Sequence, residues 1–163
     1  MPRTLPLPTI DPSVWYADGL RFECTQCGNC CSGAPGYVWI TEKDMVKIAA
    51  YLKMEFDEFT RTYVRRINHG GEARYSLIEK PDYDCVFLTR TGGKAGCSIY
   101  PVRPTQCRTW PFWTDVVRSP ETWRKTARGG AAGNGGCPGM LDPKARLYDL
   151  QHIETCRQNP ESP

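Results

Sequence analysis

The chain has 163 residues, 40% of them hydrophobic and 24% charged, and its 21 basic and 18 acidic side chains leave a formal net charge of +3. This length suits one domain with a sizeable core and is short for two. The balanced charge argues against a nucleic-acid-binding protein, and no apolar run approaches the ~20 residues of a membrane span.

The amino terminus also lacks the apolar run of about seven or more residues that a signal peptide needs. We therefore expect a cytoplasmic protein whose thiols stay reduced. Prolines interrupt residues 1–21, which we expect to be extended. A cysteine-containing domain is expected over residues 22–157, followed by a frayed tail over residues 158–163.

The first regular elements are expected to be a strand and two helices. Residues 37–40 are a short apolar run typical of a strand. Thr41 and Asp44 form a variant of the capping box, and apolar residues follow at helical spacing. A second helix is expected over residues 57–66. Its core face would carry Phe56, Phe59 and Tyr63. Its exposed face would carry Arg61, Arg65 and Arg66.

The middle of the chain has the composition of β-strands. We expect strands over residues 74–79 and 84–89. The Gly92-Gly93 pair predicts a hairpin whose return strand covers residues 96–100. Such a hairpin would bring together two cysteines, one from each arm.

Three helices are expected in the C-terminal part. Pro104 suits the first position of a short helix that carries Cys107, and Ser119 begins another helix. A glycine-rich loop over residues 129–139 lacks the phosphate-loop pattern, and Asp142 would begin the last helix. That helix would direct inward Leu147, Leu150 and Ile153. These elements together predict an α+β fold, a small single domain with several short helices and a short antiparallel hairpin or sheet.

Cysteine is the most unusual component of the chain. Four cysteines occur within the eight positions of residues 24–31, as C-x2-C-x2-C-C. The nine cysteines are Cys24, Cys27, Cys30, Cys31, Cys85, Cys97, Cys107, Cys137 and Cys156. An odd number cannot all pair, and thiols stay reduced in the cytoplasm, so a disulfide framework is disfavoured.

A metal explains the crowding better, because thiolates suit zinc and iron–sulfur clusters and a C-x2-C turn brings two sulfurs within reach of one ion. The C-x2-C-x2-C run resembles that of bacterial ferredoxins, which gives three ligands to a [4Fe–4S] cluster. The candidate metal ligands are Cys24, Cys27, Cys30, Cys31, Cys85, Cys97, Cys107 and Cys137. They are enough for two four-thiolate sites, or for one site with spare structural thiols. Adjacent side chains rarely point the same way, so Cys30 and Cys31 are expected to serve different centres, or one to ligate and the other to pack.

Several side chains near Cys107 are expected to support such a centre. Arg103 and Arg108 flank this cysteine and would offset the negative charge of bound thiolates, as cofactor-binding residues. Trp110 and Trp113 follow, and we expect them to pack in the core rather than line a pocket. The predicted fold therefore surrounds a multi-cysteine metal centre.

No catalytic residue can be assigned. The chain has two histidines, no HExxH sequence and no recognisable nucleophile set, which disfavours hydrolase chemistry. His152 precedes Cys156 by one helical turn, a spacing that a metal-binding pair can use. We favour a core cysteine and a surface histidine at these two positions.

The motifs together resemble the CxxCxxCC family, the YkgJ-like cysteine cluster proteins described as zinc- or iron-chelating domains. The matching stretches are FECTQCGNCC at residues 22–31, the cysteine pair at 85 and 97, and IYPVRPTQCRTWPF at residues 99–112. The family's cysteines match all candidate ligands by position, with Cys137 matched only by its CPG context and Cys156 unmatched. The resemblance implies a metal-binding cysteine cluster and no settled reaction.

Four functions are compatible with these observations. The cluster can stabilise the fold as a structural metal centre. It can also serve an iron–sulfur oxidoreductase or electron carrier with an unidentified redox partner, or a metal-handling protein. A thiol switch through Cys30 and Cys31 would leave the other clustered cysteines unexplained. The ferredoxin-like run and the thiolate-only ligand set place an iron–sulfur cluster, of [4Fe–4S] type, slightly ahead of Zn²⁺.

Overall fold

The computed structural model describes residues 7–33, 35–129 and 135–162. Short helices alternate with short antiparallel strands, which confirms the predicted α+β class. The strands are β1 (Leu20–Arg21), β2 (Val38–Ile40), β3 (Val64–His69), β4 (Glu72–Leu77), β5 (Leu88–Thr91), β6 (Lys94–Cys97) and β7 (Leu147–Tyr148). The α-helices are α1 (Glu42–Leu52), α2 (Phe56–Tyr63), α3 (Thr105–Thr109), α4 (Thr114–Val117), α5 (Pro120–Arg128) and α6 (Leu150–Arg157). No helix in the described ranges is long and apolar enough to cross a membrane.

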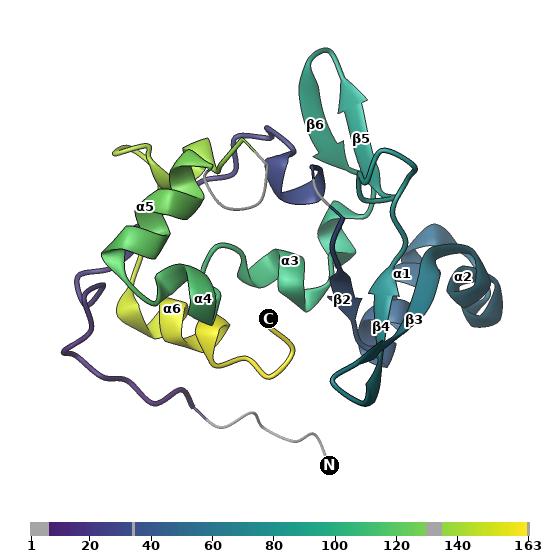
Figure 1. Cartoon of the computed structure of the whole chain (residues 1–163), viewed down its shortest axis with the longest axis horizontal. Helices are drawn as coiled ribbons and strands as arrows, with labels where there is room; N and C mark the ends of the chain where they lie inside the picture. Colours follow the sequence, from purple (N-terminus) through teal and green to yellow (C-terminus); the bar gives the residue numbers. More distant parts are fainter. Residues whose placement is uncertain (1–6, 34, 130–134, 163) are drawn as a thin grey trace.

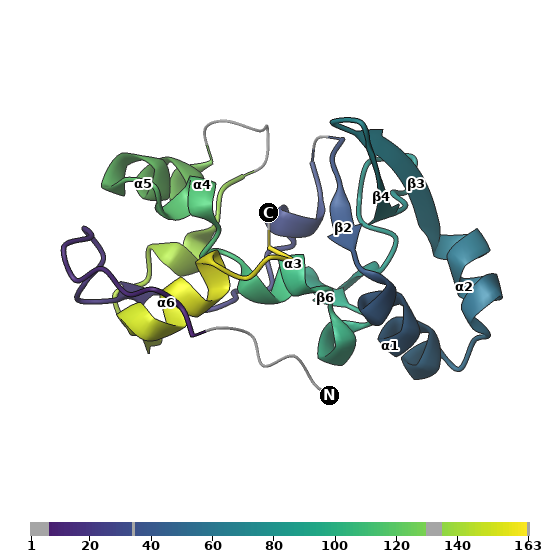
Figure 2. The ribbon, with the colours of Figure 1, turned by 90° about the horizontal axis from the view of Figure 1, so that it is seen from below.

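The elements form two lobes on either side of α3 (Figures 1 and 2). The sheet lobe contains β2, β3 and β4 with α1 and α2, and the helical lobe contains α4, α5 and α6. Each lobe has its own cluster of buried apolar side chains.

The sheet lobe follows from local sequence signals. The Thr41 hydroxyl accepts a hydrogen bond from the Asp44 backbone N–H at 3.1 Å, and the Asp44 carboxylate accepts one from the Thr41 N–H, so the predicted capping box is confirmed. Ile48 of α1 and Phe59 of α2 are fully buried. They pack against the three-stranded sheet, in which β4 pairs with both β2 and β3 in antiparallel register.

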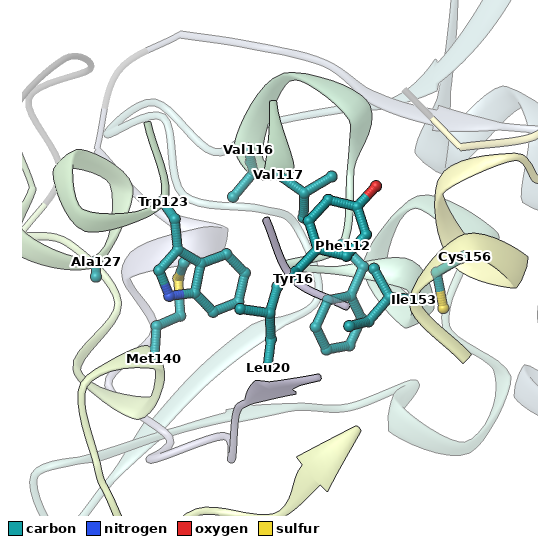
Figure 3. Close-up of a cluster of buried hydrophobic side chains, with 10 residues drawn as sticks. All are labelled: Tyr16, Leu20, Phe112, Val116, Val117, Trp123, Ala127, Met140, Ile153 and Cys156. Atoms are coloured by element: carbon teal, nitrogen blue, oxygen red, sulfur yellow. The ribbon is translucent and has the colours of Figure 1, made fainter. Parts of the chain in front are cut away.

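The helical lobe buries a cluster that draws on both ends of the chain (Figure 3). Tyr16 and Leu20 from the N-terminal segment pack with Phe112, Trp123 and α6. The Tyr16 hydroxyl donates a 2.6 Å hydrogen bond to the carboxylate of the buried Glu154. A buried carboxylate needs such donors, and this bond fixes the N-terminal segment on α6.

Helix α3 is attached to the sheet lobe through one side chain. The Gln106 Oε1 accepts a 2.7 Å hydrogen bond from the Trp39 backbone N–H, and its Nε2 donates to the Tyr37 carbonyl at 2.9 Å. Gln106 therefore continues the hydrogen bonding of β2 and places α3 beside that strand (Figure 2).

The second helix ends earlier than the sequence predicts. It stops at Tyr63, and Val64–His69 forms β3, so Arg65 and Arg66 lie on a strand and not on an exposed helix face. The chain changes to strand here because residues 64–69 pair along their length with β4, which outweighs a weak helical preference. Phe56, expected on the core, is exposed.

Three further boundaries differ from expectation. The last helix begins after Asp149, whose carboxylate accepts from the His152 N–H at 2.8 Å, because Leu147 pairs with β1 and is exposed. The hairpin at Gly92-Gly93 is confirmed, but its strands are β5 and β6, and Cys85 lies before them at an isolated bridge with Glu79. The short helix α3 begins at Thr105, one residue after Pro104.

Candidate metal centre

The cysteine loop, residues 24–31, turns at Gly28. This residue has a φ of +78°, and a Cβ placed on it would lie 2.6 Å from the Cβ of Ala95. The Gly28 carbonyl accepts hydrogen bonds from the Cys31 N–H and the Ser32 hydroxyl. Glycine is required here because the backbone is left-handed and β6 passes directly against it.

The cysteine loop also makes backbone contacts that position three cysteines. The Cys85 N–H donates a 2.7 Å hydrogen bond to the Cys31 carbonyl, which places these residues side by side. The Ala95 N–H donates to the Gln26 carbonyl at 2.9 Å, which holds the loop on β6. Cys97 ends β6, opposite Leu88. The cysteine loop is therefore bonded both to Cys85, which precedes the hairpin, and to β6, the strand that ends at Cys97.

Cys137 approaches the same loop from the helical lobe. Its N–H donates to the Ala127 carbonyl at the end of α5, at 2.9 Å. The Asn29 side chain donates to the Gly136 carbonyl at 2.9 Å, and the Glu23 N–H donates to the Gly139 carbonyl at 3.2 Å. These bonds join the cysteine loop to the segment 135–139.

The adjacent cysteines do not diverge. The Cys30 and Cys31 sulfurs lie 3.7 Å apart, because residues 29–31 form a turn of 3-10 helix and not an extended strand. Hydrogen bonding between the two sulfurs lowers the pKa of Cys30 to about 7 and raises that of Cys31. The expectation that adjacent side chains point apart is therefore wrong at this position.

The remaining thiols of the group are half-buried, and burial makes them harder to ionise without a metal. Burial raises the pKa of Cys85, Cys97 and Cys107, and the charge of neighbouring cysteines raises it further. Burial also raises the pKa of Cys137, where Cys27 and Cys30 are the charged neighbours. A bound cation would reverse these shifts, because a coordinated thiol is deprotonated.

Electrostatic interactions link the cysteines through Cys30. Besides burial, the charge of Cys30 raises the pKa of Cys85, Cys97, Cys107 and Cys137, and the charge of Cys27 also acts on Cys137. Cys137 and the cysteines of the sheet lobe therefore lie near the same sulfur.

Cys24 and Cys156 differ from the other cysteines in their surroundings. Cys24 is exposed at the start of the cysteine loop. Cys156 is buried in the helical lobe, where its sulfur lies 3.6 Å from the His152 Nε2. Cys156 is thus a core residue and His152 is exposed, as the sequence indicates, with the His152 ring resting on Tyr148 and Phe112.

The sulfurs gather without forming a finished coordination sphere. All nine cysteines are free thiols, and within the described ranges no three Cys, His, Asp or Glu side chains converge closely enough to hold a metal ion. The donor chemistry fits zinc or an iron–sulfur cluster, because the gathered groups are all sulfur. Coordination would need the loops to close further, which is consistent with metal binding coupled to ordering.

The two arginines predicted to support the centre differ in position. The charge of Arg103 contributes to the lowered pKa of Cys30 and opposes the rise that burial causes at Cys97 and Cys107, so it lies within electrostatic range of the thiols. Its guanidinium also stacks 3.7 Å from the Tyr100 ring. Arg108 instead donates to the Thr105 hydroxyl at 2.7 Å. Arg103 is therefore the arginine placed to offset thiolate charge.

Lys80 and Trp110 are neighbours of the cysteines that the sequence did not identify in this role. The Lys80 ammonium donates to the Leu88 carbonyl at 2.7 Å, and its charge opposes the rise in the pKa of Cys85 that burial causes. The Trp110 indole opposes the effect of burial on Cys137 by hydrogen bonding. Neither has a spacing signal, because each approaches its cysteine from a distant part of the chain.

Comparison with known proteins supports the same chemistry. The family CxxCxxCC, described as "Putative zinc- or iron-chelating domain", matches residues 23–162. The "Uncharacterized protein MJ0661" of Methanocaldococcus jannaschii is 40% identical over 102 residues, which are 62% of this chain. The chain spans about half the length of that curated relative, 50%. No solved structure matches the chain.

Proposed function

The chain belongs to the CxxCxxCC family of zinc- or iron-chelating domains, and from this premise we propose that it binds metal through cysteine thiolates at the junction of its two lobes. One observation carries the proposal. The cysteine loop is hydrogen-bonded on one side to β6 and on the other to segment 135–139. A metal held by this loop and by the cysteines of both neighbours would join the lobes.

We assign the ligands to two adjacent four-thiolate sets that meet at the Cys30–Cys31 pair. The first set is Cys31, Cys85, Cys97 and Cys107. The second set is Cys24, Cys27, Cys30 and Cys137. The Cys85–Cys31 backbone bond supports the first set, and the proximity of Cys137 to Cys27 and Cys30 supports the second. Cys24 joins the second set through its C-x2-C spacing from Cys27.

The surrounding residues would serve the bound metal in distinct ways. Arg103 and Lys80 offset the negative charge of the first set. Gly28 lets the loop approach β6, the strand that ends at Cys97. An iron–sulfur cluster held here would supply one-electron redox chemistry, and a zinc ion would supply structural stabilisation. We place the cluster ahead of zinc because the C-x2-C-x2-C run resembles a ferredoxin run.

Electron transfer is the second candidate function, and the exposure of Cys24 and Cys30 favours it. A centre near the surface can exchange electrons with a partner protein, whereas a deeply buried one cannot do so quickly. A reversible midpoint potential in the purified protein would support this role. A redox-inactive zinc centre would rule out electron transfer and leave only the structural role.

The test of the proposal is a metal count on protein purified without oxygen. We expect about eight iron and eight acid-labile sulfide per chain for two clusters, or about two zinc without sulfide. Substituting Cys107→Ser or Cys137→Ser should each remove about half of the metal. The matched control, Cys156→Ser, should remove none, because that sulfur lies in the helical lobe.

Three results would contradict these assignments. Protein without metal, with its thiols reduced, would refute the proposed function. Complete metal loss from either single variant would refute the assignment of the ligands to two sets that bind metal independently. Loss of metal from Cys156→Ser would place a ligand outside the predicted eight.

A further inference from the structure

The segment that follows α6, residues 159–162, folds back onto α3 (Figures 1 and 2). It turns at Asn159, whose side-chain oxygen accepts a hydrogen bond from the Glu161 backbone N–H at 2.9 Å. The Asn159 carbonyl accepts from the Ser162 N–H, also at 2.9 Å. This turn places the half-buried side chains of Glu161 and Ser162 against α3.

Two buried threonines of α3 bind this segment. The Thr105 hydroxyl donates a 2.8 Å hydrogen bond to the Glu161 carboxylate. The Ser162 hydroxyl shares its proton between the Thr109 hydroxyl at 2.8 Å and the Cys156 carbonyl of α6 at 2.9 Å. Thr105 and Thr109 are 2% and 5% exposed and lie one turn apart on the same side of the helix. The segment therefore joins one side of α3 to the end of α6.

The Thr105 hydroxyl also links two opposite charges. It accepts a 2.7 Å hydrogen bond from the Arg108 guanidinium while it donates to the Glu161 carboxylate. Hydrogen bonds with a charged partner are stronger than neutral ones, and here one end of the chain of bonds is a cation and the other an anion. Glu161 thus supplies the acceptor that holds the Thr105 hydroxyl in one orientation.

Helix α3 is therefore held from two sides, and Cys107 lies between the residues that hold it. Gln106 bonds to β2, whereas Thr105 and Thr109 bond to segment 159–162. Hydrogen bonds are directional, so bonds on two sides fix the rotation of the helix about its axis as well as its place. A metal ligand must stay within about 0.5 Å of its productive position, and rotation of α3 would move the Cys107 sulfur away from it.

We propose that Glu161 is a positioning residue of the metal centre, which acts through the Thr105 hydroxyl to fix the direction of the Cys107 sulfur in the first set. This inference rests on the proposed function, which assigns Cys107 as a ligand. Replacing a residue that orients a ligand from outside the ligand set changes metal affinity by about 10- to 100-fold. The effect should be confined to the first set, because the second set has no ligand on α3.

The first experiment measures Zn²⁺ binding by the metal-free chain in competition with a chromophoric chelator. Glu161→Ala should weaken binding at one set by about 10-fold or more. The variant should fold, because the Glu161 side chain lies outside both apolar clusters, and urea unfolding of the metal-free protein checks this. Glu161→Gln should stay within about threefold of the wild type, since its amide oxygen still accepts from Thr105. The control, Glu121→Ala, removes an exposed carboxylate from α5 and should change neither set.

A second comparison distinguishes positioning of Cys107 from a general loss of stability. Cys107→Ser removes the ligand through which Glu161 is inferred to act. Adding Glu161→Ala to Cys107→Ser should therefore leave the Zn²⁺ affinity of the remaining set within about twofold. A general loss of stability would weaken the remaining set as well.

The outcomes separate this inference from the proposed function. If the wild type binds no Zn²⁺, the proposed function fails and the inference with it. If the wild type binds Zn²⁺ and Glu161→Ala binds it equally well, the inference alone is overturned. Further weakening in the double variant, or equal weakening by Glu161→Gln and Glu161→Ala, would overturn the route through Thr105 and Cys107 in the same way.

Discussion

Gly28 is the residue on which the shape of the cysteine loop depends most directly. Its positive φ turns the chain between Cys27 and Cys30, and its missing Cβ leaves room for Ala95. An L-residue held in this conformation costs about 1–3 kcal/mol. The contact with Ala95 adds to that cost, because the β-hairpin backbone on which it lies cannot move freely.

We therefore expect Gly28→Ala to lower the free energy of unfolding by about 2–4 kcal/mol and to reduce metal content. The control is Gly92→Ala, at the hairpin turn, where φ is +58° and nothing lies within 4 Å of an added Cβ. Urea unfolding of both variants, with metal analysis, makes the comparison. Equal destabilisation with unchanged metal content would show that the loop does not need to approach β6.

At the scale of elements, α3 is short but carries Cys107 and joins the two lobes. A helix of five residues has little stability of its own, so its position depends on tertiary bonds. Gln106 makes the decisive ones, because both ends of its buried amide bond to the backbone of β2.

Gln106→Met should keep the side-chain length but leave the Trp39 N–H and the Tyr37 carbonyl without this partner. We expect a loss of about 1–3 kcal/mol of stability, because two partly buried hydrogen bonds, each worth about 0.5–1.5 kcal/mol, are removed. The metal should also dissociate faster, since Cys107 is one helical residue away. Gln151→Met, on the exposed face of α6, is the control and should change neither quantity. Wild-type metal dissociation in Gln106→Met would show that Cys107 is held by other contacts.

The hairpin and the helix caps show which elements are specified locally. The capping residues Thr41 and Ser119 begin α1 and α5 as predicted, because a cap needs only residues within one turn. The sequence pattern predicts the end of α2 too late and the start of α6 too early. In the structure, β3 pairs with β4 and β7 pairs with β1. Partner strands from elsewhere in the chain decided those boundaries.

At the scale of the whole molecule, the separate cores of the two lobes meet through segments rich in cysteine. Loops with few buried apolar contacts open at low free energy, whereas packed helices open near the global value. If the metal holds these loops, removing it should loosen the junction before it unfolds either lobe.

We expect anaerobic chelation to accelerate amide hydrogen exchange in residues 24–31 and 135–139 by about 10-fold or more. Amides of α1 and α6 should change much less, because each belongs to its own apolar cluster. The melting temperature should fall by roughly 10 °C, the effect of losing a tight ligand from a chain of this size. Uniform acceleration of exchange throughout the chain would instead mean that the metal stabilises the whole fold. No change in exchange would mean that the metal does not stabilise the junction.

The sequence alone determined the fold class, the hairpin turn, the helix caps and the sulfur chemistry of the centre, because each depends on residue type and short spacing. The tertiary structure decided what depends on distant partners: segment 135–139 bonding to the cysteine loop, and Arg103 lying near the thiols while Arg108 donates to Thr105. The tertiary structure also decided how Cys30 and Cys31 are oriented. The 3-10 turn that sets their sulfurs side by side lies against β6.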